Sequence, residues 1–123
     1  RTAESIAAAF GRFEVIPESL MDAATALAGS SPAFVFMMIE AMADAAVLEG
    51  MPRAQAYRFA AQAVAGSARM ALEDGAHPAA LKDAVCSPAG TTIEGVRVLE
   101  ELGFRSSVME ALHATCEKSR DFG

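Results

Sequence analysis

Apolar residues recur along almost the whole chain at the spacing of helices, and glycine and proline divide them into segments. The longest segment predicts a helix that starts at Ser31 as N-cap and ends at Gly50. Between its first turn and Leu48 the only polar residues are Glu40 and Asp44, which lie four apart and therefore on one face. A helix that is apolar almost all round is buried on nearly every side. We expect a partner subunit to cover it.

Glycine and proline residues also mark the ends of further predicted helices. They are Thr2–Phe10, Glu18–Ala28, Pro52–Asp74, His77–Val85, Thr91–Gly103 and Phe104–Phe122. Only the stretch Arg12–Ile16 alternates polar and apolar residues as a strand does. One strand cannot form a sheet, so it pairs with another chain or is the last piece of a further domain. The predicted fold is all-α, a bundle of about six helices over residues 18–123, preceded by this short strand within residues 1–17.

Composition narrows the class of protein. The chain of 123 residues is 53% hydrophobic, more than a small monomer needs, which favours an oligomer interface. Its net charge of -6 argues against nucleic acid, and no basic amphipathic helix suggests a membrane surface. The charge-free run Ala23–Ile39 is interrupted at Gly29–Pro32, so we expect no membrane span. No signal peptide and only two cysteines are present, which predicts a reduced, cytoplasmic protein.

Few residues outside one loop carry candidate chemistry. His77 and His113 have no partners at metal-ligand spacing, so no metal site is expected, and His77 before a proline suits a helix cap. Glu40 and Asp44 are an acid/base pair, a narrow solvated stripe on a buried helix, or partners for arginines across an interface. Cys86 is either a nucleophile or a small buried residue, and it lacks an evident histidine partner.

The loop between the predicted helices His77–Val85 and Thr91–Gly103 has two interpretations. Thr91 and Glu94 have the spacing of a capping box, with Thr91 as N-cap and Glu94 reaching back to it. Alternatively, Gly90 opens the backbone to a ligand, and the helix start offers amides to a carboxylate or phosphate. The hydroxyls of Ser87 and Thr92 would then add hydrogen bonds. The local pattern allows both.

The segment "HPAALKDAVCSPAGTTIEGVRVLEELGFRSSVMEAL" closely resembles the C-terminal signature of pyrroline-5-carboxylate reductases. The matching residues are His77-Pro78, Leu81-Lys82-Asp83, Val85, Ser87-Pro88-Ala89-Gly90-Thr91-Thr92 and Gly103-Phe104-Arg105. Upstream, "TALAGSSPAFVF" and "EGMPRAQA" are similar to two further motifs of this family, so the resemblance extends over about Glu18–Arg120.

This resemblance implies an enzyme that reduces 1-pyrroline-5-carboxylate to L-proline with hydride from NADPH or NADH. Family members have an N-terminal Rossmann domain and a C-terminal helical domain, and two helical domains interlace into a homodimer. Some members assemble five such dimers into a decamer. This sequence contains no Gly-x-Gly-x-x-Gly after a strand, so residues 1–17 are expected to be the end of a Rossmann domain lying outside it. We expect the 123 residues alone to be inactive.

The resemblance also implies roles for the loop residues. Ser87 and Thr92 would donate side-chain hydrogen bonds to the substrate carboxylate, and Gly90 and Thr91 would donate backbone ones. The Thr92 hydroxyl, or a water that it holds, is also a candidate proton donor to the imine nitrogen.

Three positions depart from the family pattern. Ser31 replaces a glycine, Phe34 replaces a tyrosine and so removes a hydroxyl, and Ala89 replaces a frequent glycine. Two alternatives stay open. One is a related two-domain reductase of another imine or keto acid, and the other is a stand-alone helical oligomerisation module without a ligand.

Overall fold

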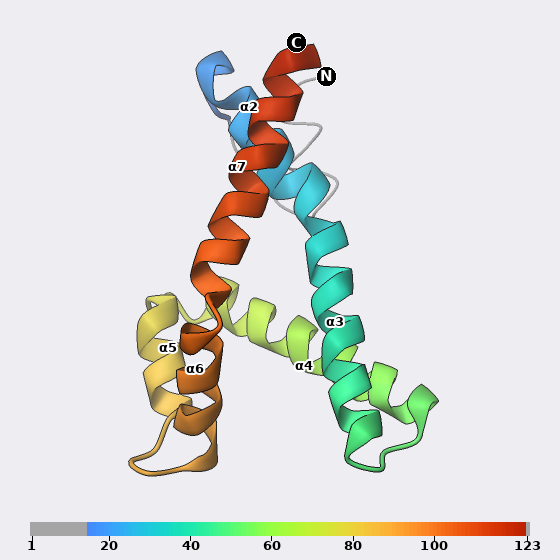
Figure 1. Ribbon diagram of the computed structural model, residues 1–123. Coiled ribbons are helices and arrows are strands. Elements are labelled where there is room, and N and C mark those ends of the chain that lie inside the picture. Colours follow the sequence, from blue (N-terminus) through green and yellow to red (C-terminus); the bar gives the residue numbers. More distant parts are fainter. Residues whose placement is uncertain (1–14, 123) are drawn as a thin grey trace. The chain divides into compact units, whose positions relative to one another are not determined.

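The computed structural model describes residues 15–122, and their regular structure is helical, which confirms the all-α prediction (Figure 1). The expected helix Thr2–Phe10 lies outside the described residues, as does most of the expected strand Arg12–Ile16. Its last two residues, Val15 and Ile16, belong to no regular element.

Five longer helices follow a short irregular start. A 3₁₀ turn at Glu18–Leu20 leads into α2 (Met21–Ala24), and a π-helical segment, Thr25–Ser30, leads into α3. The longer helices are α3 (Ser31–Leu48), α4 (Arg53–Glu73), α5 (Pro78–Val85), α6 (Thr91–Glu101) and α7 (Phe104–Phe122). Glycines end two of these helices as predicted, because Gly50 and Gly75 adopt φ angles of 108° and 83° that other residues rarely reach.

The predicted break near Gly29 is wrong, because helical structure continues from residue 18 to residue 48. Ser31 is not an N-cap. Its Oγ instead donates to the carbonyl oxygen of Leu27, one turn back in the same helix. Pro32 lacks an amide hydrogen and its ring crowds the preceding turn, and the wider π-helical segment just before it accommodates both effects.

The continuous helix changes the argument about membranes. Glu18–Leu48 has 31 residues and a mean hydropathy of 1.5, so by length and composition alone it is able to cross a bilayer. The sequence predicts no membrane span because Gly29–Pro32 interrupts the charge-free run Ala23–Ile39, but the structure shows no interruption of the helix there. A helix covered by protein in an oligomer has the same composition, so absence of a membrane span stays a prediction.

The chain divides into two compact units. Residues 37–104 form one unit, in which α3 and α4 pack through Ala43, Ala56 and Ala60. The other unit contains described residues 15–36 and 105–122, and there the Ser119 Oγ of α7 donates to Asp22 Oδ1 of α2 over 2.7 Å. The buried residues are alanines in the first unit, and Ala26 and Cys116 in the second, so the described residues of neither unit form a core of large side chains.

Many large apolar side chains are exposed in the single chain. Phe36 and Met37 on α3 are 66% and 65% exposed, and Phe59 on α4 is 59% exposed. Among the described residues, only four alanines and Cys116 are buried. Exposed apolar area on this scale is typical of an interaction surface. This agrees with the expectation drawn from the apolar pattern of α3.

Candidate functional site

The loop between α5 and α6 begins with a tight turn over Ser87–Gly90. The Gly90 amide donates to the Ser87 carbonyl oxygen over 3.0 Å, which closes the turn. Pro88 follows Ser87, and Ala89 has a positive φ of 61°. Proline at the second position and a positive φ at the third are typical of a type II turn, in which glycine is favoured third. The turn therefore explains why the resembled family often has glycine at the position of Ala89.

Gly90 is needed for a steric reason. Its φ and ψ of -82° and 177° are open to any residue. A Cβ on Gly90, however, would overlap with Ser87 Oγ and lie 3.2 Å from the Ser87 carbonyl oxygen. The sequence predicts that a ligand approaches the backbone at Gly90. In the structure, the group that lies close to Gly90 is the Ser87 side chain.

The start of α6 differs from the predicted capping box. Gly90, not Thr91, is the N-cap residue, and it provides no side-chain hydrogen bond. Thr91 and Thr92 are exposed residues of the first turn. Within residues 15–122 their hydroxyls have no hydrogen-bond partner. The first amides of α6 therefore point out of the helix without a side-chain acceptor.

Glu94 does not reach back to the helix start, because Arg97 holds its carboxylate. Arg97 Nε donates to Glu94 Oε1 over 2.6 Å, and Arg97 Nη2 donates to Glu94 Oε2 over 3.2 Å. Arg97 Nη1 also donates to Glu101 Oε2 over 2.9 Å. The hydrogen bonds to Glu94, and then those to Glu101, raise the pKa of the Arg97 guanidinium above its ordinary value. Two bonds to a cation outcompete the single amide bond of a capping box.

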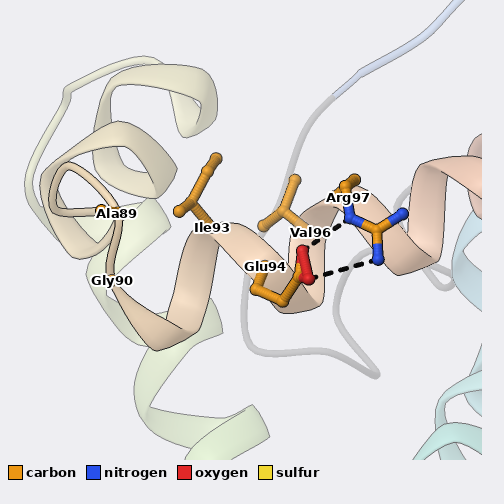
Figure 2. A pocket seen from close by; sticks show the side chains of 6 residues that line it. All are labelled: Ala89, Gly90, Ile93, Glu94, Val96 and Arg97. Atoms are coloured by element: carbon orange, nitrogen blue, oxygen red, sulfur yellow. Dashed lines mark hydrogen bonds and ion pairs between the residues drawn. The ribbon is translucent and has the colours of Figure 1, made fainter.

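An open depression of about 600 Å³ lies beside this turn (Figure 2). Figure 2 shows the turn residues Ala89 and Gly90 at one end and the Glu94–Arg97 pair further along α6. The lining residues are Ala89, Gly90, Ile93, Glu94, Val96 and Arg97. Of the four predicted binding residues, Gly90 alone lines it, and Ser87, Thr91 and Thr92 are not among its lining residues.

The other candidate residues form no catalytic or metal-binding group within residues 15–122. His77 is the N-cap of α5, and its Nδ1 accepts a hydrogen bond from the Ala79 amide over 3.0 Å, which confirms the predicted cap. Cys86 is half-buried and has a free thiol. His113 is exposed on α7. Across residues 15–122, no three His, Cys, Asp or Glu side chains lie close enough to hold a metal ion.

The carboxylates of α3 form no acid/base pair. Asp44 Oδ1 accepts a hydrogen bond from Arg53 Nη1 at the corner between α3 and α4, and the Arg53 guanidinium lies 5.9 Å from the centre of the Tyr57 ring. The hydrogen bond to Asp44 raises the pKa of Arg53. Asp44 therefore pairs with an arginine of its own chain, and Glu40 is an exposed residue of the same helix.

Sequence reasoning missed Arg97. Its spacing of three residues from Glu94 and four from Glu101 is the signal that could have identified the ion pairs. The capping-box pattern drew attention to Glu94 alone.

Comparison with known proteins gives one consistent family. A family model described as "Pyrroline-5-carboxylate reductase dimerisation" matches residues 18–122. The chain is 68% identical over 110 residues to pyrroline-5-carboxylate reductase of Escherichia coli (strain K12), covering 89% of this chain and 41% of that protein. It is 55% identical over 123 residues to the Methanosarcina acetivorans protein of the same name, covering all of this chain and 46% of the relative.

Solved structures of pyrroline carboxylate reductases are also similar to this chain. The chain superimposes on 1-pyrroline-5-carboxylate reductase of Streptococcus pyogenes with a TM-score of 0.87 and 42% identity, covering 91% of this chain and 43% of that one. For the Plasmodium falciparum pyrroline carboxylate reductase, solved with NADP bound, the TM-score is 0.85 and the identity 38%, over 89% of this chain and 42% of that one. The chain thus spans less than half the length of these relatives.

Proposed function

Because the chain belongs to the pyrroline-5-carboxylate reductase dimerisation family, we propose that it is the helical domain of an enzyme that reduces 1-pyrroline-5-carboxylate to L-proline. The observation that carries the proposal is the match over residues 18–122, supported by 68% identity to a relative of that name. The enzyme acts in proline biosynthesis in the cytoplasm, on a small molecule and without a membrane or nucleic acid.

The uncapped start of α6 supports a role in holding the substrate carboxylate. The Thr91 amide lies at the positive end of the helix dipole, and no side chain caps it. The Gly90 amide donates to the Ser87 carbonyl oxygen in the turn, so it would have to exchange that bond to serve as the second backbone donor. The Ser87 and Thr92 hydroxyls would add donors from the turn and the first helical turn. Thr92 is the proposed catalytic residue, delivering a proton to the imine nitrogen directly or through a water.

The nicotinamide cofactor is proposed to bind mainly outside the described helices. Residues 15–122 contain no strand followed by a glycine-rich turn, so they lack the usual cradle for a dinucleotide. The Plasmodium falciparum relative was solved with NADP. We propose that an N-terminal Rossmann domain of the full-length protein binds NADPH or NADH, and that residues 1–17 end that domain.

A second copy of the chain is the proposed cover for the exposed apolar faces. The family description names dimerisation, and α3 and α4 expose Phe36, Met37 and Phe59. Desolvating such side chains is the main driving force of subunit association. The assembly is a homodimer, or a decamer of five dimers.

A substrate panel with the full-length protein tests the function. We expect NADPH- or NADH-dependent formation of L-proline from 1-pyrroline-5-carboxylate, and much weaker activity with larger cyclic imines and with 2-keto acids. Preference for another imine or for a keto acid would favour the related reductase. The 123-residue chain is the matched control and should show no turnover with either cofactor.

A further inference from the structure

Glu94 is the only acidic residue in the first turn of α6, so it is the anion nearest to the proposed carboxylate site on that helix. It lines the same depression as Gly90. Side chains on a helix lean toward its N-terminus, so an unrestrained Glu94 carboxylate would extend toward the first amides of α6, which begin at Thr91 and have no side-chain acceptor. There it would compete with a substrate carboxylate for the same donors and repel it.

Arg97 prevents this by its position one turn further along the helix. Its two hydrogen bonds to Glu94, over 2.6 and 3.2 Å, draw the carboxylate toward the C-terminal end of α6 (Figure 2). The third bond, from Nη1 to Glu101, holds the guanidinium from the other side. Arg97 thus both orients Glu94 and balances its charge.

We propose that Arg97 is a positioning residue for substrate binding, which keeps the Glu94 carboxylate away from the α6 amides that receive the substrate carboxylate. The inference rests on the proposed function. It assigns no contact between Arg97 and the substrate, and the effect of Arg97 passes through Glu94.

The test is a double-mutant cycle in the full-length enzyme, with KM for the imine and for NADPH measured separately. Arg97→Gln frees Glu94, so KM for 1-pyrroline-5-carboxylate should rise about five- to tenfold, which is the size of one uncompensated charge near the surface. The value of kcat and KM for NADPH should change by less than about twofold, because the lost interaction concerns substrate binding. Added salt should reduce the increase in KM by screening.

The double variant Glu94→Gln with Arg97→Gln should return KM for the imine to within about twofold of the original value, because the released charge is gone. Arg120→Gln is the matched control, since Arg120 pairs with Glu117 three residues earlier on α7. This control should leave KM unchanged. An unchanged KM in Arg97→Gln, or a double variant as impaired as the single one, overturns the positioning role.

Failure of the proposed function would look different. In that case the unsubstituted full-length protein would not reduce 1-pyrroline-5-carboxylate at all, which would refute the function and this inference with it. Normal turnover by the parent enzyme together with an unchanged KM in Arg97→Gln would refute the inference alone.

Discussion

Replacement of Gly90 by alanine should disrupt the junction between the Ser87–Gly90 turn and α6. The new methyl group would overlap with Ser87 Oγ and lie 3.2 Å from the Ser87 carbonyl oxygen. Overpacking of this kind costs about 1–3 kcal/mol, because a side chain or the backbone must move. Alanine is also a poorer N-cap than glycine by about 0.5–1 kcal/mol. The free energy of unfolding should therefore fall by about 1.5–4 kcal/mol.

The assay is thermal unfolding of the purified chain followed by circular dichroism at a fixed protomer concentration, since dimerisation also affects the midpoint. For a chain of this size, about 1 kcal/mol corresponds to about 4 °C, so Gly90→Ala should lower the Tm by about 6–16 °C. Combining it with Ser87→Ala removes the overlapping hydroxyl and should restore about half of that loss. A Tm equal to that of the original chain, or no recovery in the double variant, would refute the steric argument.

Three further substitutions test other parts of the account. Gly29→Ala should raise the free energy of unfolding by about 0.5–1 kcal/mol in urea titrations, because Gly29 lies inside helical structure and its added Cβ would meet only Thr25 Cγ2, at 3.8 Å. Destabilisation would instead support a chain break there. Phe36→Asp should shift the chain toward monomer in sedimentation velocity, with Glu40→Gln on the same helix as a control that stays dimeric, and a dimeric Phe36→Asp would place the interface elsewhere. Ala89→Val should lower stability by about 1–2 kcal/mol and Ala89→Gly should not lower it, because a β-branched residue is strained at a φ of 61°; equal stability of the two variants would argue against a positive φ.

Sequence reasoning predicted those features that depend on neighbouring residues. His77 before Pro78 gave the α5 cap, and Gly50 gave the end of α3, because a cap or a left-handed residue works through local hydrogen bonds. The predicted helix break at Gly29 was wrong, because the residues on both sides of it favour a continuous helix. Gly29 and Pro32 would end an isolated helix, but apolar residues on both sides keep the chain helical through a π-helical segment.

The candidate site shows the same division. The turn residues of the Ser87–Thr92 loop and the family signature predict that this loop binds the substrate carboxylate. The true N-cap, Gly90, and the pairing of Glu94 with Arg97 could not be read from it, because they depend on competition between two acceptable partners for one carboxylate. The capping-box pattern indicates only that the Glu94 carboxylate is able to reach an amide at the helix start. It does not take into account that the Arg97 guanidinium binds the same carboxylate.

The most direct test of the proposed substrate loop is the reduction of 1-pyrroline-5-carboxylate by the full-length enzyme carrying Thr92→Ala. Thr92 has an exposed hydroxyl in the first turn of α6, without a partner in the described part of the chain, and is proposed to serve both the carboxylate and the imine nitrogen. Thr92→Ala should lower kcat/KM for the imine at least about tenfold, since a hydrogen bond to a charged group contributes about 1.5–3 kcal/mol, and should leave KM for NADPH unchanged. Unchanged kinetics toward the imine would contradict the account.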